Sequence, residues 1–149
     1  YTSLRISPSG KWLAFQYSNI SFVSIPSLAI IPLNGSSKDK TDIPFDRSKG
    51  NITWSKDEKY IYFSAQSNGA QPLYRAGITT KKVEQLTGYN SGILNFDLSA
   101  DKIIYVKTEV SNPFELYIAD TNAANPQRIS SFNTGWLQNK KLSFPEKRT

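Results

Sequence analysis

The sequence of 149 residues contains no cysteine and no histidine. Without cysteine, the chain has no disulfide, no thiolate metal site and no cysteine nucleophile. Without histidine, it lacks the most common general base and metal ligand, so no Ser-His-Asp triad can form and a zinc site would need carboxylates alone. We therefore expect no catalytic residue, no metal and no cofactor in this chain, and no enzyme activity of its own.

Long hydrophobic runs are also missing. The longest apolar region, residues 20–33, is interrupted by Pro26, Pro32 and three serines, and it is shorter than the ~20 clean residues that span a membrane. Residue 1 already lies in polar, patterned sequence and not in a leader. We expect no membrane partner, and the localisation stays open between the cytoplasm and the periplasm or exterior of a bacterium.

Positive charge is present but scattered. Eighteen Lys and Arg against 12 Asp and Glu give a net charge of +6, with hydrophobic residues at 38% and aromatic residues at 13%. The basic residues form small pairs beside acidic ones, with no stripe of stacking aromatics, so we expect no nucleic-acid partner. The aromatic content excludes a disordered chain, and the length suits one folded domain.

An internal repeat dominates the sequence. Three serines each precede a run of aromatic and aliphatic residues, 48 and 44 positions apart: Ser7, Ser55 and Ser99. Three apolar residues recur near the ends of the units at a strict spacing of 43: Ile43, Leu86 and Ile129. Repeats in phase at this period are typical of propeller blades.

Each unit divides into four short runs of β-branched and aromatic residues, which predict strands. In the second unit these runs are residues 51–54, 59–64, 72–77 and 82–87. We predict an all-β, partial β-propeller of about three four-stranded antiparallel blades, at about 1–47, 48–90 and 91–131. An immunoglobulin-like sandwich is the alternative, but a sandwich gives no reason for an in-phase repeat.

The sequences of residues 7–15 and 54–63 resemble the strand-turn-strand motif of TolB-like propellers and of the propeller domain of prolyl oligopeptidase-family serine peptidases. Residues 115–117, 126–130, 132–133, 136–137 and 141–146 resemble the end of the last blades in acylaminoacyl-peptidase and dipeptidyl-peptidase-like members. The resemblance implies that residues 132–149 are a tail or linker leading toward an α/β-hydrolase domain outside this chain.

The chain lacks the motifs that carry catalysis and substrate binding in that family. It has no Gly-x-Ser-x-Gly nucleophile elbow, and no pair of glutamates matches the family's anchor for a substrate amino terminus, so the substrate-binding residues stay unknown. Family propellers have seven or eight blades, and we read the chain as a fragment of one. The resemblance implies a part that gates the access of short peptides to a hydrolase domain of the same parent chain. The alternative is a TolB-like scaffold for protein–protein binding with no enzyme attached.

Several residues could suggest a ligand site, but each has a structural explanation that we favour. Three tryptophans could stack on a ligand, and we assign them to core packing: Trp12, Trp54 and Trp136. Three acids could suggest calcium, and we assign them to turns: Asp57, Glu58 and Asp101. Two arginines could hold a carboxylate, and we assign them to solvent: Arg47 and Arg75. Three asparagines match the glycosylation pattern, which we attribute to chance: Asn19, Asn34 and Asn51.

A three-blade piece leaves two blade faces without neighbours. Each blade of a propeller buries both faces against adjacent blades, and apolar patches beyond a few hundred Å² rarely stay bare. We therefore expect self-association through the exposed blade faces.

Overall fold

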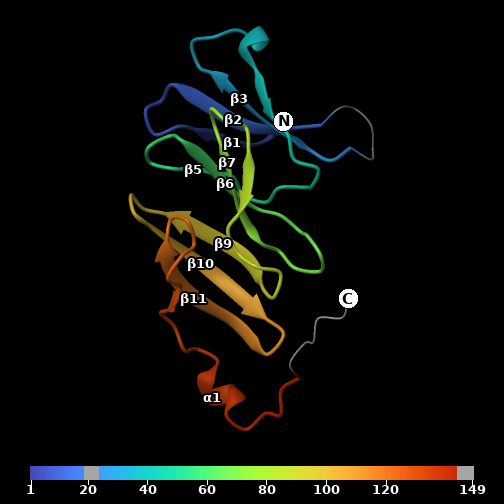
Figure 1. The fold of residues 1–149 in the computed structure, drawn as a ribbon, viewed down its shortest axis with the longest axis vertical. Coiled ribbons are helices and arrows are strands. Elements are labelled where there is room, and N and C mark those ends of the chain that lie inside the picture. Colours follow the sequence, from blue (N-terminus) through green and yellow to red (C-terminus); the bar gives the residue numbers. More distant parts are fainter. Residues whose placement is uncertain (19–23, 144–149) are drawn as a thin grey trace.

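The computed structural model describes residues 1–18 and 24–143. These residues form three four-stranded antiparallel sheets, stacked face to face along the long axis of the molecule (Figure 1). Blade 1 holds β1 (Thr2–Ile6), β2 (Trp12–Tyr17), β3 (Ser27–Pro32), η1 (Ser37–Asp39) and β4 (Thr41–Ile43). Blade 2 holds β5 (Thr53–Trp54), β6 (Tyr60–Ser64), β7 (Leu73–Gly77) and β8 (Val83–Gln85). Blade 3 holds β9 (Gly92–Leu98), β10 (Lys102–Glu109), β11 (Asn112–Asp120) and β12 (Gln127–Arg128). The all-β prediction with three four-stranded units is confirmed.

The repeated serine is explained by the first turn of each blade. Its hydroxyl oxygen accepts the backbone N–H at the start of the second strand, from Trp12 in blade 1 (3.2 Å), Tyr60 in blade 2 (2.9 Å) and Lys102 in blade 3 (3.0 Å). In all three blades the serine N–H also donates to the carbonyl of that same residue. The serine therefore closes the hairpin locally, which explains its recurrence at one place in every unit.

Replacing Ser55 with alanine is expected to lower the free energy of unfolding by about 1 kcal/mol, because the Tyr60 amide loses an acceptor and the turn loses its closing bond. Urea unfolding followed by circular dichroism measures the change. Lys56→Ala, in the same turn, is the control and should stay within about 0.5 kcal/mol of the original chain. An equal effect of both substitutions would contradict this role for the hydroxyl.

A second repeated hydroxyl lies after the fourth strand. The Leu73 amide donates to Thr87 Oγ1 (2.9 Å), and 43 residues later the Leu116 amide donates to Ser130 Oγ (2.8 Å). The apolar residue before each hydroxyl behaves differently in the two blades. Leu86 packs on the core between blades 2 and 3, whereas Ile129 is 53% exposed, because blade 3 has no following blade in the described chain.

Two apolar clusters join the three blades. The cluster between blades 1 and 2 is built mainly from Ala14, Leu28, Ile30, Ile43, Ile52, Trp54, Ile61, Phe63, Tyr74 and Ala76. The cluster between blades 2 and 3 consists of Tyr62, Leu73, Ile93, Phe96, Ile103, Tyr105 and Ala119. Since both faces of blade 2 are covered, β6 and β7 read as continuous apolar runs without alternation.

Polar bonds fix the register between neighbouring blades. The Trp54 indole N–H donates to the Arg5 carbonyl (2.9 Å), and Glu58 accepts bonds from the amide and the hydroxyl of Ser9. Between blades 2 and 3, the Gln71 side chain donates to the Ile93 carbonyl (3.1 Å). The bonds between Ser9 and Glu58 place the first turns of blades 1 and 2 next to each other.

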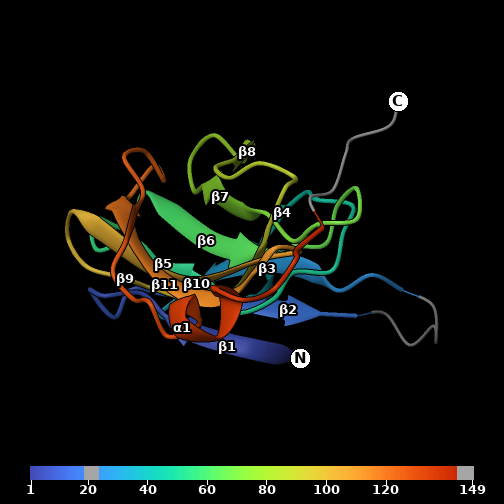
Figure 2. The ribbon, with the colours of Figure 1, turned by 90° about the horizontal axis from the view of Figure 1, so that it is seen from below.

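The segment after blade 3 contains one helical turn, α1 (Thr134–Leu137). The segment lies below blade 3 in Figure 1, and the view from below places it in front of β10 and β11 (Figure 2). The Ser111 hydroxyl donates to the carbonyl of Ser143 (2.5 Å). In the described part of the chain no helix is long and apolar enough to cross a membrane.

Candidate functional site

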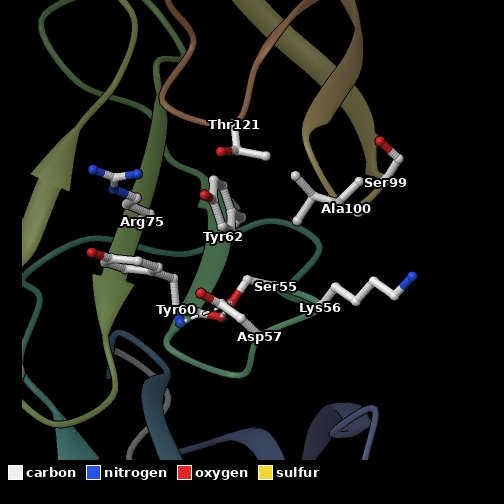
Figure 3. A pocket seen from close by; sticks show the side chains of 10 residues that line it. Ser55, Lys56, Asp57, Tyr60, Tyr62, Arg75, Ser99, Ala100 and Thr121 are labelled. Atoms are coloured by element: carbon white, nitrogen blue, oxygen red, sulfur yellow. Dashed lines mark hydrogen bonds between the residues drawn. The ribbon is translucent and has the colours of Figure 1, made fainter.

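A pocket of about 280 Å³ opens between blades 2 and 3, beside the first turns of both blades (Figure 3). Its lining is rich in hydroxyl groups and cations: Ser55, Lys56, Tyr60, Tyr62, Arg75, Ser99 and Thr121. The β6 and β7 strands supply the aromatic rings and the arginine, and the turns supply the serines. The chemistry of this lining decides what the pocket can do.

The cation deepest in this group already has partners. The Arg75 Nε atom lies 2.8 Å from a carboxylate oxygen of Glu84, and the guanidinium carbon lies 4.5 Å from the centre of the Tyr60 ring. An arginine held by a carboxylate and a ring offers little positive charge to an added anion. Arg75 therefore packs within blade 2, whereas Arg47 is a surface residue 3.7 Å from the Asp46 carboxylate.

Ser55 and Asp57 form a serine–carboxylate contact at the mouth of the pocket. The Ser55 hydroxyl donates to Asp57 Oδ1 (2.7 Å). This bond, together with the amide and the ammonium of Lys59, holds the pKa of the Asp57 carboxyl below its ordinary value. A carboxylate with a lowered pKa is a poor general base at neutral pH. The pair therefore closes a turn.

The three turn acids bond to three different serines. Asp101 contacts Ser99 in blade 3, as Asp57 contacts Ser55 in blade 2, while Glu58 reaches across to Ser9 in blade 1. Among the described residues there is no group of three or more acidic, histidine or cysteine side chains that could hold a metal ion. Each acid has a partner that explains its place.

The three tryptophans have different environments. Trp54 is 7% exposed in the core between blades 1 and 2, and Trp12 packs against the same core. Trp136, in α1, is 62% exposed, and the Lys140 ammonium lies 5.4 Å from the centre of its ring. Core packing thus holds for the two repeat-related tryptophans, and the third lies on the surface of the segment after blade 3.

The asparagines of the glycosylation pattern lie at the surface where they are described. Asn34 is exposed in the turn after β3, and Asn51 is exposed before β5. Asn19 lies outside the described residues.

The most densely bonded polar group is one to which sequence reasoning assigned no role. Glu115, in β11, is buried, and its carboxylate accepts hydrogen bonds from the Ser130 hydroxyl, the Asn133 amide (3.0 Å) and the Phe132 amide (3.3 Å). These donors hold the pKa of the Glu115 carboxyl below its ordinary value. The bonds anchor the start of the segment after blade 3. The sequence feature that could have pointed to this role is an acidic residue in the middle of an apolar strand.

Lys49 is a second buried charge whose role sequence reasoning missed. Its ammonium donates to the Pro26 carbonyl (2.6 Å) and the Phe45 carbonyl (3.3 Å), and burial lowers the pKa of its side chain. The lysine thereby ties the loop before β3 to the segment between blades 1 and 2. Its role is to position the backbone.

Comparisons with known proteins identify the fold class. The chain matches no protein-family model, and no curated protein sequence matches it either. Solved structures do match. TolB from Acinetobacter baumannii is 21% identical, with 86% of this chain and 32% of that chain covered and a TM-score of 0.68. Three stacked four-stranded sheets with this similarity are blades of a β-propeller.

Two peptidase structures match equally well. Acylaminoacyl peptidase from Pyrococcus horikoshii is 18% identical, with 89% of this chain and 20% of that chain covered and a TM-score of 0.68. The β-propeller domain of the Trilobed protease from Pyrococcus furiosus is 17% identical, with 83% of this chain and 38% of that domain covered and a TM-score of 0.67.

The chain therefore has the fold shared by TolB propellers and the propeller domains of prolyl oligopeptidase-family peptidases, which confirms the resemblance seen in the sequence at the level of fold. It spans less than half the length of each of these proteins.

Proposed function

We propose that this chain is a non-catalytic part of the propeller of a serine peptidase, and that it gates the access of short peptides to a hydrolase domain of the same parent chain. The observation that carries the proposal is the anchoring of residues 130–133 by Glu115. The chain does not simply stop after the fourth strand of blade 3: a buried carboxylate holds the following segment. Such an anchor suits a segment that must leave the propeller in a defined direction toward a second domain.

In this proposal the blades act by excluding substrates, and the parent's hydrolase domain supplies the chemistry. The side chains of the pocket between blades 2 and 3 support this division, because the Ser55 hydroxyl is bonded to Asp57 within a turn and Arg75 is already paired with Glu84. A rigid stack of blades admits short, unstructured peptides and excludes folded proteins on size alone.

A protein-binding scaffold of the TolB type is the second candidate. Exposed apolar side chains at the two ends of the stack favour it, Leu4 on blade 1 and Phe114 and Phe132 on or after blade 3, because exposed apolar surface is typical of interfaces. In this case the function lies in surface contacts and no hydrolase is attached.

The full-length gene product distinguishes the two proposals. It is labelled with a fluorophosphonate probe for serine hydrolases, and its intact mass is measured. Labelling of a chain several hundred residues longer supports the peptidase, whereas an unlabelled protein with no hydrolase domain supports the scaffold. The 149-residue chain alone should not hydrolyse an aminoacyl chromogenic substrate, and detectable hydrolysis would contradict the non-catalytic role.

A further inference from the structure

The edge strands of the three sheets differ in length. Each sheet ends on one side at its first strand (β1, β5 or β9) and on the other side at its fourth (β4, β8 or β12). An edge strand presents unpaired backbone N–H and C=O groups, to which an extended chain can add as a further strand. In the described part of the chain β9 is the longest edge strand, with seven residues, and the other five have two to five. An extended chain would therefore find the most bonding partners along β9.

The pairing of β9 with β10 determines which amides face this free edge. The Ser99 amide, just after β9, donates to the Lys102 carbonyl (2.8 Å), and the pairing continues without a break from Leu98 back to Asn95. Bonded and non-bonded pairs alternate along an antiparallel ladder, so the amides of Leu98 and Phe96 point away from β10. An added strand would need these two amides as donors.

Both amides are already bonded to the side chain of the residue before them. The Phe96 amide donates to Asn95 Oδ1 (3.0 Å), and the Leu98 amide donates to Asp97 Oδ1 (2.8 Å). Asparagine and aspartate side chains compete in this way with the ladder of a sheet for backbone donors. The two bonds lie two positions apart, which is the spacing of the donors along one edge of a strand.

The other end of the same edge is covered from blade 2. The Ile93 amide donates to the Gln71 carbonyl (2.8 Å), and the Gln71 side chain donates to the Ile93 carbonyl (3.1 Å). Between the two parts of β9, Leu94 is an extra residue that shifts the register, and a bulge at an edge also disfavours pairing with another strand. The amides of Ile93, Phe96 and Leu98 thus all have acceptors within the chain.

We propose that Asn95 and Asp97 keep the β9 edge closed to extended polypeptide, because each occupies the amide of the residue that follows it. The closure depends on bonds within blades 2 and 3 and not on what adjoins the ends of the stack. Its use rests on the proposed function: a part that admits short, unstructured peptides has to let them pass without binding them at a sheet edge.

Amide hydrogen exchange of the 149-residue chain tests the two bonds separately. In Asn95→Ala the Phe96 amide should exchange at least about fivefold faster, after correction for the intrinsic rate, while the Leu98 amide stays unchanged. Asp97→Ala should give the reverse, so each variant is the control for the other. Unchanged exchange, or equal acceleration of both amides in either variant, would overturn the assignment of the bonds.

Binding of an added strand tests the closure itself. The probe is a fluorescent peptide with the sequence of residues 102–109, which already pairs with the other edge of β9. Its Kd should lie above about 1 mM for the original chain and be at least about tenfold lower for Asn95→Ala/Asp97→Ala, with new protection of the Phe96 and Leu98 amides. Asn34→Ala/Asp46→Ala, which changes the same residue types at exposed positions, is the matched control and should bind as the original chain does. Equal binding by the original chain and by Asn95→Ala/Asp97→Ala would overturn the proposal.

A conservative substitution separates the hydrogen bond from the charge. Asp97→Asn removes the charge but keeps an oxygen at the same place, so the peptide should bind it as weakly as it binds the original chain. Tighter binding to Asp97→Asn would assign the closure to charge and overturn the role of the bond.

Urea unfolding shows whether each variant is folded, and exchange in the single variants decides the proposal if the double variant is not. None of these results depends on labelling by a serine-hydrolase probe, so the closure of the edge and the peptidase proposal can fail separately.

Discussion

Replacing Trp54 with alanine is expected to lower the free energy of unfolding by about 3–5 kcal/mol, the range for removing a large aromatic side chain from a core. The indole fills the space between blades 1 and 2, in a cluster with Ile61 and Ala76. Its N–H also donates to the Arg5 carbonyl of β1, the first strand of blade 1. The alanine variant therefore loses packing and a polar link at once. Urea unfolding followed by circular dichroism measures the change.

Trp54→Phe separates the two contributions. Phenylalanine keeps most of the ring and removes only the indole N–H, so it should cost about 1 kcal/mol for the lost bond and a further small amount for the smaller ring. Trp136→Ala is the matched control for tryptophan removal, because Trp136 is mostly exposed on α1. If Trp54→Ala cost no more than Trp136→Ala, the interface between blades 1 and 2 would not stabilise the fold as described.

The fold could be predicted because the residues that repeat make hydrogen bonds to residues close to them in the sequence. Ser55 closes a turn with a residue five positions away, and Thr87 bonds to the strand fourteen positions before it. Such short-range contacts leave the same residue type at the same place in each unit. The predicted runs at 59–64 and 72–77 accordingly match β6 and β7 within a residue at each end.

The buried charges could not be predicted for the opposite reason. Glu115 acts on residues that follow the last strand, and Lys49 acts on a carbonyl 23 residues away. Neither contact recurs in the other blades: the positions 43 residues from Glu115 and Lys49 are Pro72 and Gly92. A contact that occurs in only one blade produces no repeat in the sequence, so only the three-dimensional structure reveals it.

Exposure also depends on neighbours that the sequence of a blade does not specify. Ile43 and Ile129 occupy the same repeat position, yet the first is buried and the second is exposed. The difference comes from the presence or absence of a following blade. The apolar period therefore predicts which residues are able to form an interface, and the stack determines which of them do.

Replacing Glu115 with glutamine is expected to release the segment after blade 3. The carboxylate accepts the backbone amides of Phe132 and Asn133 as well as the Ser130 hydroxyl. Glutamine keeps the shape of the side chain but has one acceptor oxygen and one NH₂ group. The NH₂ group must then face the backbone N–H of either Phe132 or Asn133, which loses its acceptor. Protection of the Phe132 and Asn133 amides from hydrogen exchange should fall by about tenfold at neutral pH. Glu109→Gln, a surface acid in the same blade paired with Lys107, should leave that protection unchanged.

Acidification should have the same effect on the original chain. Because hydrogen bonds lower the pKa of the folded Glu115 carboxyl, the anchor is fully present above the ordinary glutamate pKa of about 4.3 and is lost as the pH falls through the lower, folded value. Protection of the Phe132 and Asn133 amides, corrected for the intrinsic exchange rate, should therefore fall below about pH 4 in the original chain and stay low at every pH in Glu115→Gln. A pH dependence that persists in the glutamine variant would assign the transition to another group and remove Glu115 as the anchor.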